Sequence, residues 1–435
     1  MERYSHTGDG FLDGAYRLYK WRRRQAMDRR VFLERMAMAL SGAPFWSLFL
    51  PEQLWAKIPG GIKITKLKTF RVDDEVYLKI FTNQDVVGEG HATVHRRAST
   101  CEMAIRDLER VLVGRDPTRI EFLWQAMYRW PRWRGGPILN AAISGVDLAL
   151  WDILGKLLDA PVYRLLGGAV RERIRLYAHG SGIEGVQRTK EQGLTAIKTG
   201  PAVTEMIAGR KTIRRPWNLK RAVKIIEDMR IAAGDDFDIL IDAHGLLTPV
   251  MSLEFAKAIE PYRVMFLEEP IQLEGNDTLE WLGRQTTVPL ATGERHTTKW
   301  MFEDIIARHL VSYVQPDVIQ CGGITEMKKI AAMAEAQFIE VAPHCPGSLS
   351  TGLGLASLHV DASTSNCVIQ EVLPNPIGQR LELFSGRAIK ITDGYAELPA
   401  WPGLGLRLNE TVAKKFPPPA PNPQVYFEDG SVADY

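Results

Sequence analysis

The chain has 435 residues, 45% of them hydrophobic and 24% charged, and its formal net charge at pH 7 is +2. This length exceeds one ordinary core and favours a globular protein of two domains, while the near-neutral charge disfavours a nucleic-acid partner, which requires a concentrated basic surface. Widely spaced cysteines without a CxxC pair indicate reduced, buried thiols rather than a zinc knot or a disulfide scaffold at Cys101, Cys321, Cys345 and Cys367.

Residues 1–60 are predicted to form an N-terminal extension. Arg29-Arg30 precedes an apolar stretch from Met36 to Leu50, an order typical of an export signal and similar to a twin-arginine signal. On this interpretation the protein is periplasmic, and Met27 is a possible start. The alternative is a surface helix on a cytoplasmic protein, since Pro44 interrupts the apolar stretch. No other segment approaches the length of a stable membrane span.

Residues 61–170 are predicted to form an α+β domain. Apolar and polar residues alternate from Ile62 to Glu89, as in an antiparallel sheet. Helical patterns follow over Cys101–Val113 and Ile138–Leu158, and Gly167-Gly168 ends the region.

Residues 171–371 alternate short apolar runs with helix-length segments. Such runs indicate buried parallel strands, and eight of them favour a closed barrel over an open sheet. From the third run onward, successive runs end about 25 residues apart, the length of one strand–helix unit. The predicted strands are Ile174–Ala178, Ala196–Lys198, Ile239–Asp242, Val264–Glu268, Leu290–Glu294, Tyr313–Asp317, Ile339–His344 and Val368–Glu371.

Two segments depart from this regular pattern. The polar insertion Pro201–Trp217 after the second strand is interpreted as a mobile flap near the site. Residues 372–435 are rich in proline and glycine, and we expect them to return to the first domain and end in a loose tail.

Three consecutive predicted strands end in the carboxylates Asp242, Glu268 and Glu294. The carboxyl ends of barrel strands meet at one mouth, where active sites form. Three oxygen ligands suit a hard divalent cation, and magnesium keeps positions open for water and substrate oxygens. Any one of these acids could instead cap the next helix, but three at matching positions favour a magnesium site.

The next two strands end in Asp317 and His344. A carboxylate beside an imidazole orients the ring and raises its basicity, so His344 is a candidate general base. His244 follows Asp242 by two residues, and strand alternation would turn it toward the same cation. The alternatives are a structural histidine at 344 and a capping residue at 244.

Two further strand ends carry charge. Glu371 could exchange a hydrogen bond with a substrate oxygen, and Lys198 could stabilise negative charge or act as a base. For each, a structural role is the alternative.

Five ordered motifs carry a family resemblance that spans roughly Ile62 to Pro402. The chain resembles the mandelate racemase branch of the enolase superfamily, and within it galactonate dehydratase and related acid-sugar dehydratases. The motifs are Ile241-Asp242-Ala243-His244-Gly245, Phe266-Leu267-Glu268-Glu269-Pro270, Ala291-Thr292-Gly293-Glu294-Arg295, Val314-Gln315-Pro316-Asp317 with Cys321-Gly322-Gly323-Ile324, and Ala342-Pro343-His344-Cys345-Pro346.

The resemblance implies an α/β fold: a modified TIM barrel, (β/α)7β, with an α+β capping domain formed by the N-terminal region and the C-terminal segment. It implies a homo-oligomer and a small-molecule acid-sugar substrate. Its implied roles are magnesium binding by Asp242, Glu268 and Glu294, catalysis by His344, His244 and Asp317, and substrate binding by Glu371, Lys198 and Arg295.

Racemases of this branch often carry a Lys-x-Lys pair on the second strand. Here Lys198-Thr199-Gly200 keeps one lysine, which argues against a two-base racemase. The resemblance therefore implies β-elimination from an aldonate: His344 removes the proton from carbon 2, and His244 protonates the hydroxyl leaving carbon 3. A racemase or epimerase that uses Lys198 with His344, and a non-catalytic acid-sugar-binding protein, are the alternatives.

Loops of the first domain are expected to select the substrate. The candidates are His91, His95, Arg96 and Arg97, and the segment Trp130-Pro131-Arg132-Trp133-Arg134, because guanidinium groups and aromatic faces suit carboxylates and polyols. A solvated rim or an interface is an equally good interpretation.

Overall fold

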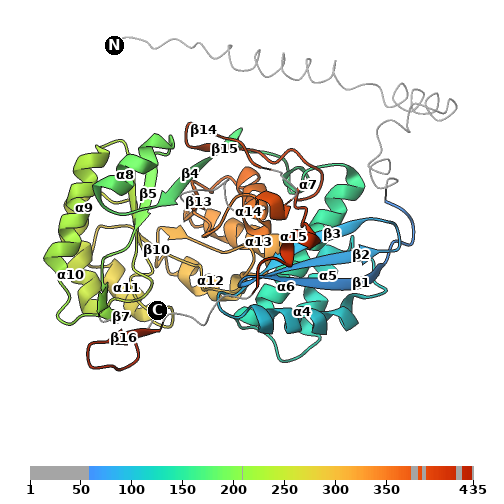
Figure 1. Cartoon of the computed structure of the whole chain (residues 1–435), viewed down its shortest axis with the longest axis horizontal. Helices are drawn as coiled ribbons and strands as arrows, with labels where there is room; N and C mark the ends of the chain where they lie inside the picture. Colours follow the sequence, from blue (N-terminus) through green and yellow to red (C-terminus); the bar gives the residue numbers. More distant parts are fainter. Residues whose placement is uncertain (1–57, 208, 374–380, 385–387, 418–423, 434–435) are drawn as a thin grey trace, which may run out of the picture. The chain divides into compact units, whose positions relative to one another are not determined.

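The computed structural model describes residues 58–207, 209–373, 381–384, 388–417 and 424–433 (Figure 1). The predicted extension over residues 1–60 and its twin-arginine signal lie almost wholly outside the described residues.

The first domain pairs an antiparallel sheet with helices (Figure 1). Its strands are β1 (Ile64–Val72), β2 (Glu75–Thr82) and β3 (Val87–Ala92), in that spatial order. The predicted helices correspond to α4 (Ala98–Leu112) and α6 (Pro137–Leu158), and the structure adds α5 (Ile120–Arg129) and the short α7 (Val162–Leu165). Within the described residues, α6 alone is long and apolar enough to cross a membrane, but 83% of that window is buried inside the protein.

Glycines allow α6 to lie directly on β3. A Cβ added to Gly90 would stand 2.0 Å from the carbonyl oxygen of Gly145, and one added to Gly88 would stand 2.1 Å from that of Ala149. Because these neighbours are backbone atoms, no rotamer change could make room. The close approach buries α6 against the sheet.

The second domain is the predicted barrel. Eight parallel strands follow one another in the described chain, and closure comes from pairing of the last strand with the first, Glu371 opposite Tyr177, and from a bridge between Val341 and Cys367. The strands are β4 (Arg173–His179), β5 (Ala196–Thr199), β8 (Asp238–Asp242), β9 (Phe266–Glu268), β10 (Leu290–Thr292), β11 (Tyr313–Val314), β12 (Glu340–Val341) and β13 (Gln370–Val372).

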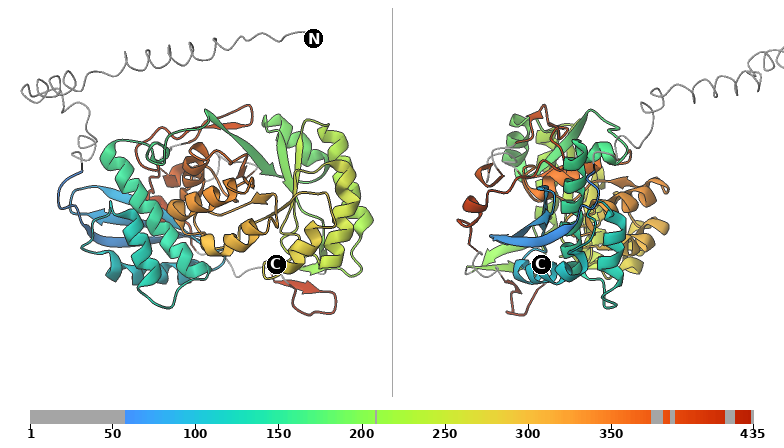
Figure 2. Two further views of the ribbon diagram at one scale, coloured as in Figure 1. Left: turned by 180° about the vertical axis from the view of Figure 1, so that it is seen from behind. Right: turned by 90° about the vertical axis from the view of Figure 1, so that its right-hand side faces the viewer.

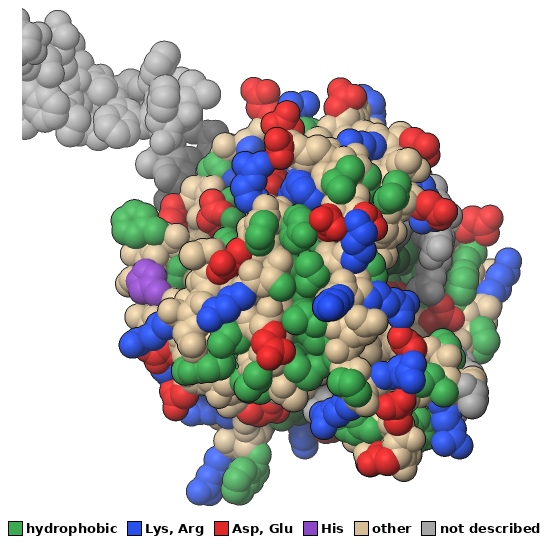
Figure 3. Space-filling model, turned by 90° about the vertical axis from the view of Figure 1, so that its left-hand side faces the viewer, with side chains coloured by type: hydrophobic (Ala, Val, Ile, Leu, Met, Phe, Trp, Pro, Cys, Tyr) green, Lys and Arg blue, Asp and Glu red, His purple; other side chains and the backbone are tan. Residues whose placement is uncertain are grey.

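A helix follows every barrel strand of the described chain except β13, which confirms the (β/α)7β architecture. These helices are α8 (Gly182–Glu191), α9 (Leu219–Ala233), α10 (Pro249–Ile259), α11 (Asn276–Gly283), α12 (Thr298–Ala307), α13 (Gly323–Glu335) and α14 (Gly352–Ala362). The 3-10 turn η2 (Glu260–Tyr262) extends α10. Figure 2 shows α8–α10 at the end of the molecule away from β1–β3. On that end, acidic and basic side chains intermingle with small apolar areas (Figure 3).

A layer of apolar side chains fills the barrel interior below its mouth. It consists of one residue each from seven strands or their immediate ends: Tyr177, Ala196, Leu240, Phe266, Ala291, Ala342 and Ile369. Since side chains on a strand face the same side every second residue, the position two residues later lies one layer nearer the mouth. This register positions most of the site described below.

The insertion after β5 is the segment predicted to be a mobile flap, and its mobility stays a prediction. It forms a hairpin of β6 (Thr204–Ile207) and β7 (Arg210–Ile213), and β16 (Val425–Phe427) adds to β7 in parallel. The tail predicted to be loose therefore supplies a strand to this small sheet.

The rest of the C-terminal segment joins both domains. The hairpin of β14 (Ile391–Thr392) and β15 (Tyr395–Glu397) pairs with β4. After η3 (Leu381–Phe384) and before the tail, α15 (Glu410–Ala413) contacts the first domain: Glu410 bonds Lys68 at 2.6 Å and Lys79 at 3.0 Å.

Candidate active site

All eight barrel strands contribute a charged or imidazole side chain at the mouth. Six of these residues lie two positions after a member of the interior layer: His179, Lys198, Asp242, Glu268, His344 and Glu371. The other two are Glu294, two residues after β10, and Asp317, three residues after β11. The strand register thus gathers into one cluster residues that are far apart in sequence.

The predicted metal ligands are adjacent. One oxygen from each of Asp242, Glu268 and Glu294 lies within 4.8 Å of the others. Burial and the charge of Asp242 raise the pKa of Glu268 well above its usual value. Oε2 of Glu294 is buried and has no hydrogen-bond partner among the described residues. A close set of mutually repelling carboxylates, two of them buried and one partly exposed, fits a hard divalent cation such as magnesium.

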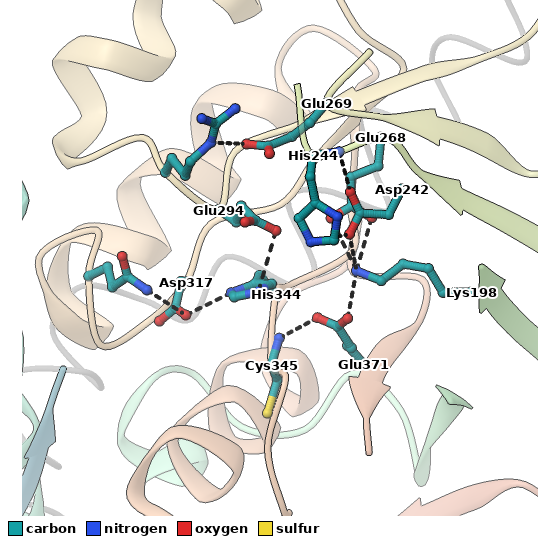
Figure 4. A network of polar contacts seen from close by, with 12 residues as sticks. Lys198, Asp242, His244, Glu268, Glu269, Glu294, Asp317, His344, Cys345 and Glu371 are labelled. Carbon is teal, nitrogen blue, oxygen red and sulfur yellow. Dashed lines mark hydrogen bonds and ion pairs between the residues drawn. The ribbon is translucent and has the colours of Figure 1, made fainter. Parts of the chain in front are cut away.

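Lys198 lies among these carboxylates (Figure 4). Its Nζ is 2.6 Å from Oε1 of Glu371, 3.1 Å from Glu268 and 3.4 Å from Asp242, and only 3% of its side chain is exposed. Burial alone would lower the pKa of Lys198, but Glu268 and Glu371 outweigh it and raise the pKa well above its usual value. Lys198 is therefore a fixed ammonium that offsets part of the negative charge.

Asp317 and His344 form the predicted pair. Nδ1 of His344 is 2.8 Å from Oδ2 of Asp317, and Nε2 is 3.4 Å from Oε2 of Glu294. Figure 4 shows the ring between these two acids. Burial alone would lower the pKa of His344, but the charge of Glu294 and the hydrogen bond with Asp317 raise it to about 10.

His244 also lies at the triad, but not for the reason predicted. Strand β8 ends at Asp242, and His244 occupies the following turn with a φ of +50°. Strand alternation therefore does not orient its ring. Its Nε2 lies 3.1 Å from Oδ2 of Asp242, and half of its side chain is exposed. In the barrel order, the strand before His244 stands opposite the strand before His344.

Glu371 is fully buried and already engaged. Its Oε1 binds both Lys198 and Nε2 of His179, and its Oε2 accepts a hydrogen bond from the backbone of Cys345 at 2.7 Å. Burial would raise the pKa of Glu371, but Lys198 and the bond from His179 hold it well below its usual value. Its predicted contact with substrate stays a prediction.

Arg295 is bound to other side chains at the edge of the cluster. Its Nε donates to Glu269 at 2.7 Å, and its Nη1 donates to Gln272 at 2.9 Å. Glu269 follows the candidate metal ligand Glu268 and Arg295 follows the candidate ligand Glu294, so this ion pair links two members of the triad. Burial and the charge of Glu294 raise the pKa of Glu269 to about 8. Substrate binding by Arg295 also stays a prediction.

The prediction of a first specificity loop is wrong for His91. His91 is 1% exposed, stacks on Tyr77 with ring centroids 4.3 Å apart, and accepts a hydrogen bond from the backbone of Leu353 at 3.1 Å. It joins the two domains and offers no surface to a substrate. His95 is 76% exposed and lies 3.3 Å from Asp74.

The second candidate loop, residues 130–134, lies between α5 and α6 and exposes its tryptophans. Trp133 is 82% exposed, and Trp130 packs edge-on against Phe122. The described contacts do not tie this loop to the carboxylate cluster, so its role stays a prediction.

Sequence reasoning missed His179 and Glu269. The first predicted strand stopped at Ala178, one residue before His179, although the step of two from Tyr177 could have identified it. Glu269 gave no signal beyond its place after Glu268, because its partner Arg295 is 26 residues away.

Two family models match the chain. The model described as "Mandelate racemase / muconate lactonizing enzyme, N-terminal domain" matches residues 48–167, and "Enolase C-terminal domain-like" matches residues 183–412. Together they cover both domains described above.

Solved structures agree with the family models. An enolase from Pantoea ananatis with bound D-gluconate and magnesium is 33% identical, with a TM-score of 0.78 over 86% of this chain and 99% of that one. Proteins provisionally named dehydratases from Salmonella Typhimurium and Mesorhizobium loti are each 32% identical with a TM-score of 0.75, over 82% and 81% of this chain and 98% of each of theirs.

Proposed function

The chain belongs to the mandelate racemase/muconate lactonizing enzyme branch of the enolase superfamily, and from this premise we propose that it is a magnesium-dependent dehydratase of an acid sugar. Its substrate would be an aldonate, and its product a 2-keto-3-deoxy acid. One observation carries the proposal: His344 and His244 follow opposite barrel strands and both contact the carboxylate triad.

The residues present fit a magnesium ion. Asp242, Glu268 and Glu294 would hold it, since their oxygens converge and the one ammonium beside them, that of Lys198, reaches Asp242 and Glu268 but is not shown in contact with Glu294 among the described residues. When bound, magnesium supplies Lewis acidity that stabilises the negative charge developing on the substrate carboxylate.

The two histidines would divide the proton transfers. A cation held by Glu294 would offset the charge that raises the pKa of His344, so that Nε2 of His344 could take the proton from carbon 2, while Asp317 at Nδ1 fixes the ring and stabilises its charged form. The electron pair left on carbon 2 forms the double bond to carbon 3 as the bond from carbon 3 to its hydroxyl breaks. His244 gives a proton to the departing hydroxyl, which leaves as water, and the enol tautomerises to the keto acid.

The environment of Lys198 supports elimination over racemisation. A racemase needs a proton carrier on each face of carbon 2, and that carrier must be able to lose its proton. Lys198 is bound to Glu371, Glu268 and Asp242 and is held charged, and Gly200 stands where a second lysine would be. His244, half exposed, is the more accessible second acid.

A library of aldonates and uronate derivatives, incubated with the purified chain and magnesium, tests the proposal. We expect a 2-keto-3-deoxy acid from at least one member, detected by its semicarbazone. If carbon 2 exchanges its hydrogen with deuterated solvent while no member loses water, the racemase alternative is correct.

A further inference from the structure

His179 is a mouth residue to which the proposed proton transfers give no role. It is the last residue of β4, two positions beyond Tyr177 of the interior layer, so its ring faces the barrel axis at the mouth. Its Nε2 lies 2.5 Å from Oε1 of Glu371, the same oxygen that binds Lys198.

His179 is more exposed than Glu371 and Lys198, the two residues to which it is linked. The side chain of Lys198 is 3% exposed and that of Glu371 is 0% exposed, whereas that of His179 is 37% exposed. The other carboxylate oxygen of Glu371 accepts a hydrogen bond from the backbone N–H of Cys345. Of the three linked side chains, Lys198, Glu371 and His179, only the imidazole of His179 is therefore exposed at the mouth.

The free ring atom identifies the complementary group. Because Nε2 donates to the carboxylate of Glu371, the tautomer with its proton on Nε2 offers a lone pair on Nδ1 that can accept a hydrogen bond. No group of the described chain bonds Nδ1. A hydroxyl group of a ligand is the matching donor, whereas a carboxylate has no proton to give.

The position in the barrel locates that hydroxyl. Counting around the eight strands, β4 stands opposite β10, whose end carries the triad member Glu294. A ligand whose carboxylate lies beside Glu294 would have to extend across the mouth to reach His179, which lies two strands from Asp242. A polyhydroxylated acid of several carbons has that length, and its distal hydroxyls would arrive there.

We propose that His179 binds a hydroxyl of the substrate chain beyond the two reacting carbons and thereby selects among acid sugars. This inference rests on the proposed acid-sugar substrate. Glu371 is the positioning residue, since it fixes the ring through Nε2.

A cycle of enzyme and substrate variants tests it. The preferred acid of the wild type and its 4-, 5- and 6-deoxy analogues are compared in kcat/KM, and in Kd by calorimetry with magnesium, for the wild type and His179→Phe. We expect at least a tenfold loss on the preferred acid and little further loss on the one analogue that lacks the contacted hydroxyl. His179→Gln, which keeps a donor and an acceptor, should recover part of the loss.

His309→Phe is the matched control, because His309 is exposed and bonded to Gln337, away from the mouth. An equal loss on every analogue in His179→Phe would overturn the inference and leave the proposed function standing. A wild type that neither binds nor converts any acid would overturn both.

Discussion

The imidazole of His344 is held by two acids, with Nδ1 2.8 Å from Asp317 and Nε2 3.4 Å from Glu294. One acid orients the ring and the other is a candidate ligand of the cation that would activate the substrate. The candidate base and the candidate metal site therefore lie side by side at the mouth.

His344→Asn removes the proton acceptor and puts a side chain of similar size in its place. We expect kcat for dehydration to fall by about 10²- to 10⁴-fold, the usual contribution of a general base. Magnesium binding, measured by calorimetry, should survive because the triad is intact. Wild-type turnover in this variant would remove His344 from the mechanism.

Lys198→Met leaves Glu268 and Glu371 buried without their ammonium. Breaking a buried ion pair costs about 3–5 kcal/mol, so we expect a clear fall in Tm in EDTA and partial recovery with magnesium, which restores positive charge nearby. The control is Lys390→Met, whose exposed partner Glu397 lies 2.7 Å away and whose loss should leave Tm nearly unchanged. An equal change in Tm for Lys198→Met and Lys390→Met would contradict the buried ion pairs assigned to Lys198.

The lowered pKa of His359 leads to a prediction of how the stability of the fold depends on pH. It is fully buried between the backbone of Tyr163 and Leu404, and burial lowers its pKa to about 4. Unfolded histidine titrates near 6.5. Between these values only the unfolded chain binds the proton, so stability should decline as the pH falls from about 6.5 toward 4, by up to about 3 kcal/mol from this residue.

Urea unfolding at pH 7 and pH 5 measures that decline. His359→Gln should show a smaller difference between the two pH values than the wild type does, even if its stability at pH 7 is lower. The exposed His309→Gln should behave as the wild type. If the stability difference between pH 7 and pH 5 in His359→Gln equals that of the wild type, this histidine is not the cause of the decline.

Gly90→Ala tests the close packing of α6 on β3. The added carbon would meet the backbone oxygen of Gly145, so we expect destabilisation of about 1–3 kcal/mol, the usual cost of overpacking, or more. Gly60→Ala, with no atom within 4 Å of the added carbon, is the control for thermal unfolding. A Tm equal to the wild type in Gly90→Ala would contradict the packing.

The barrel and most of its mouth were predictable because parallel strands carry a strong local signal. Apolar runs ending in Asp242, Glu268 and Glu294 need no tertiary information to be aligned. The helix α5 was missed because no comparable signal separated it from its flanking turns.

Other features depend on contacts across the fold. His91 was grouped with His95, Arg96 and Arg97 in a candidate substrate loop, yet its ring is buried and bonded to the backbone of Leu353, far along the chain. His244 reached the triad through a left-handed backbone turn that a strand pattern cannot anticipate. The role of Glu371 as an anchor required knowledge that Lys198, His179 and the backbone of Cys345 all point at it.

The proposed mechanism divides the proton transfers between His344 and His244, and His244→Asn in deuterated water measures that division most directly. Dehydration of the preferred acid sugar should fall by at least about 10²-fold, since the general acid is gone, while carbon 2 continues to exchange its hydrogen for deuterium through His344. Undiminished loss of water from His244→Asn, with magnesium still bound, would contradict it.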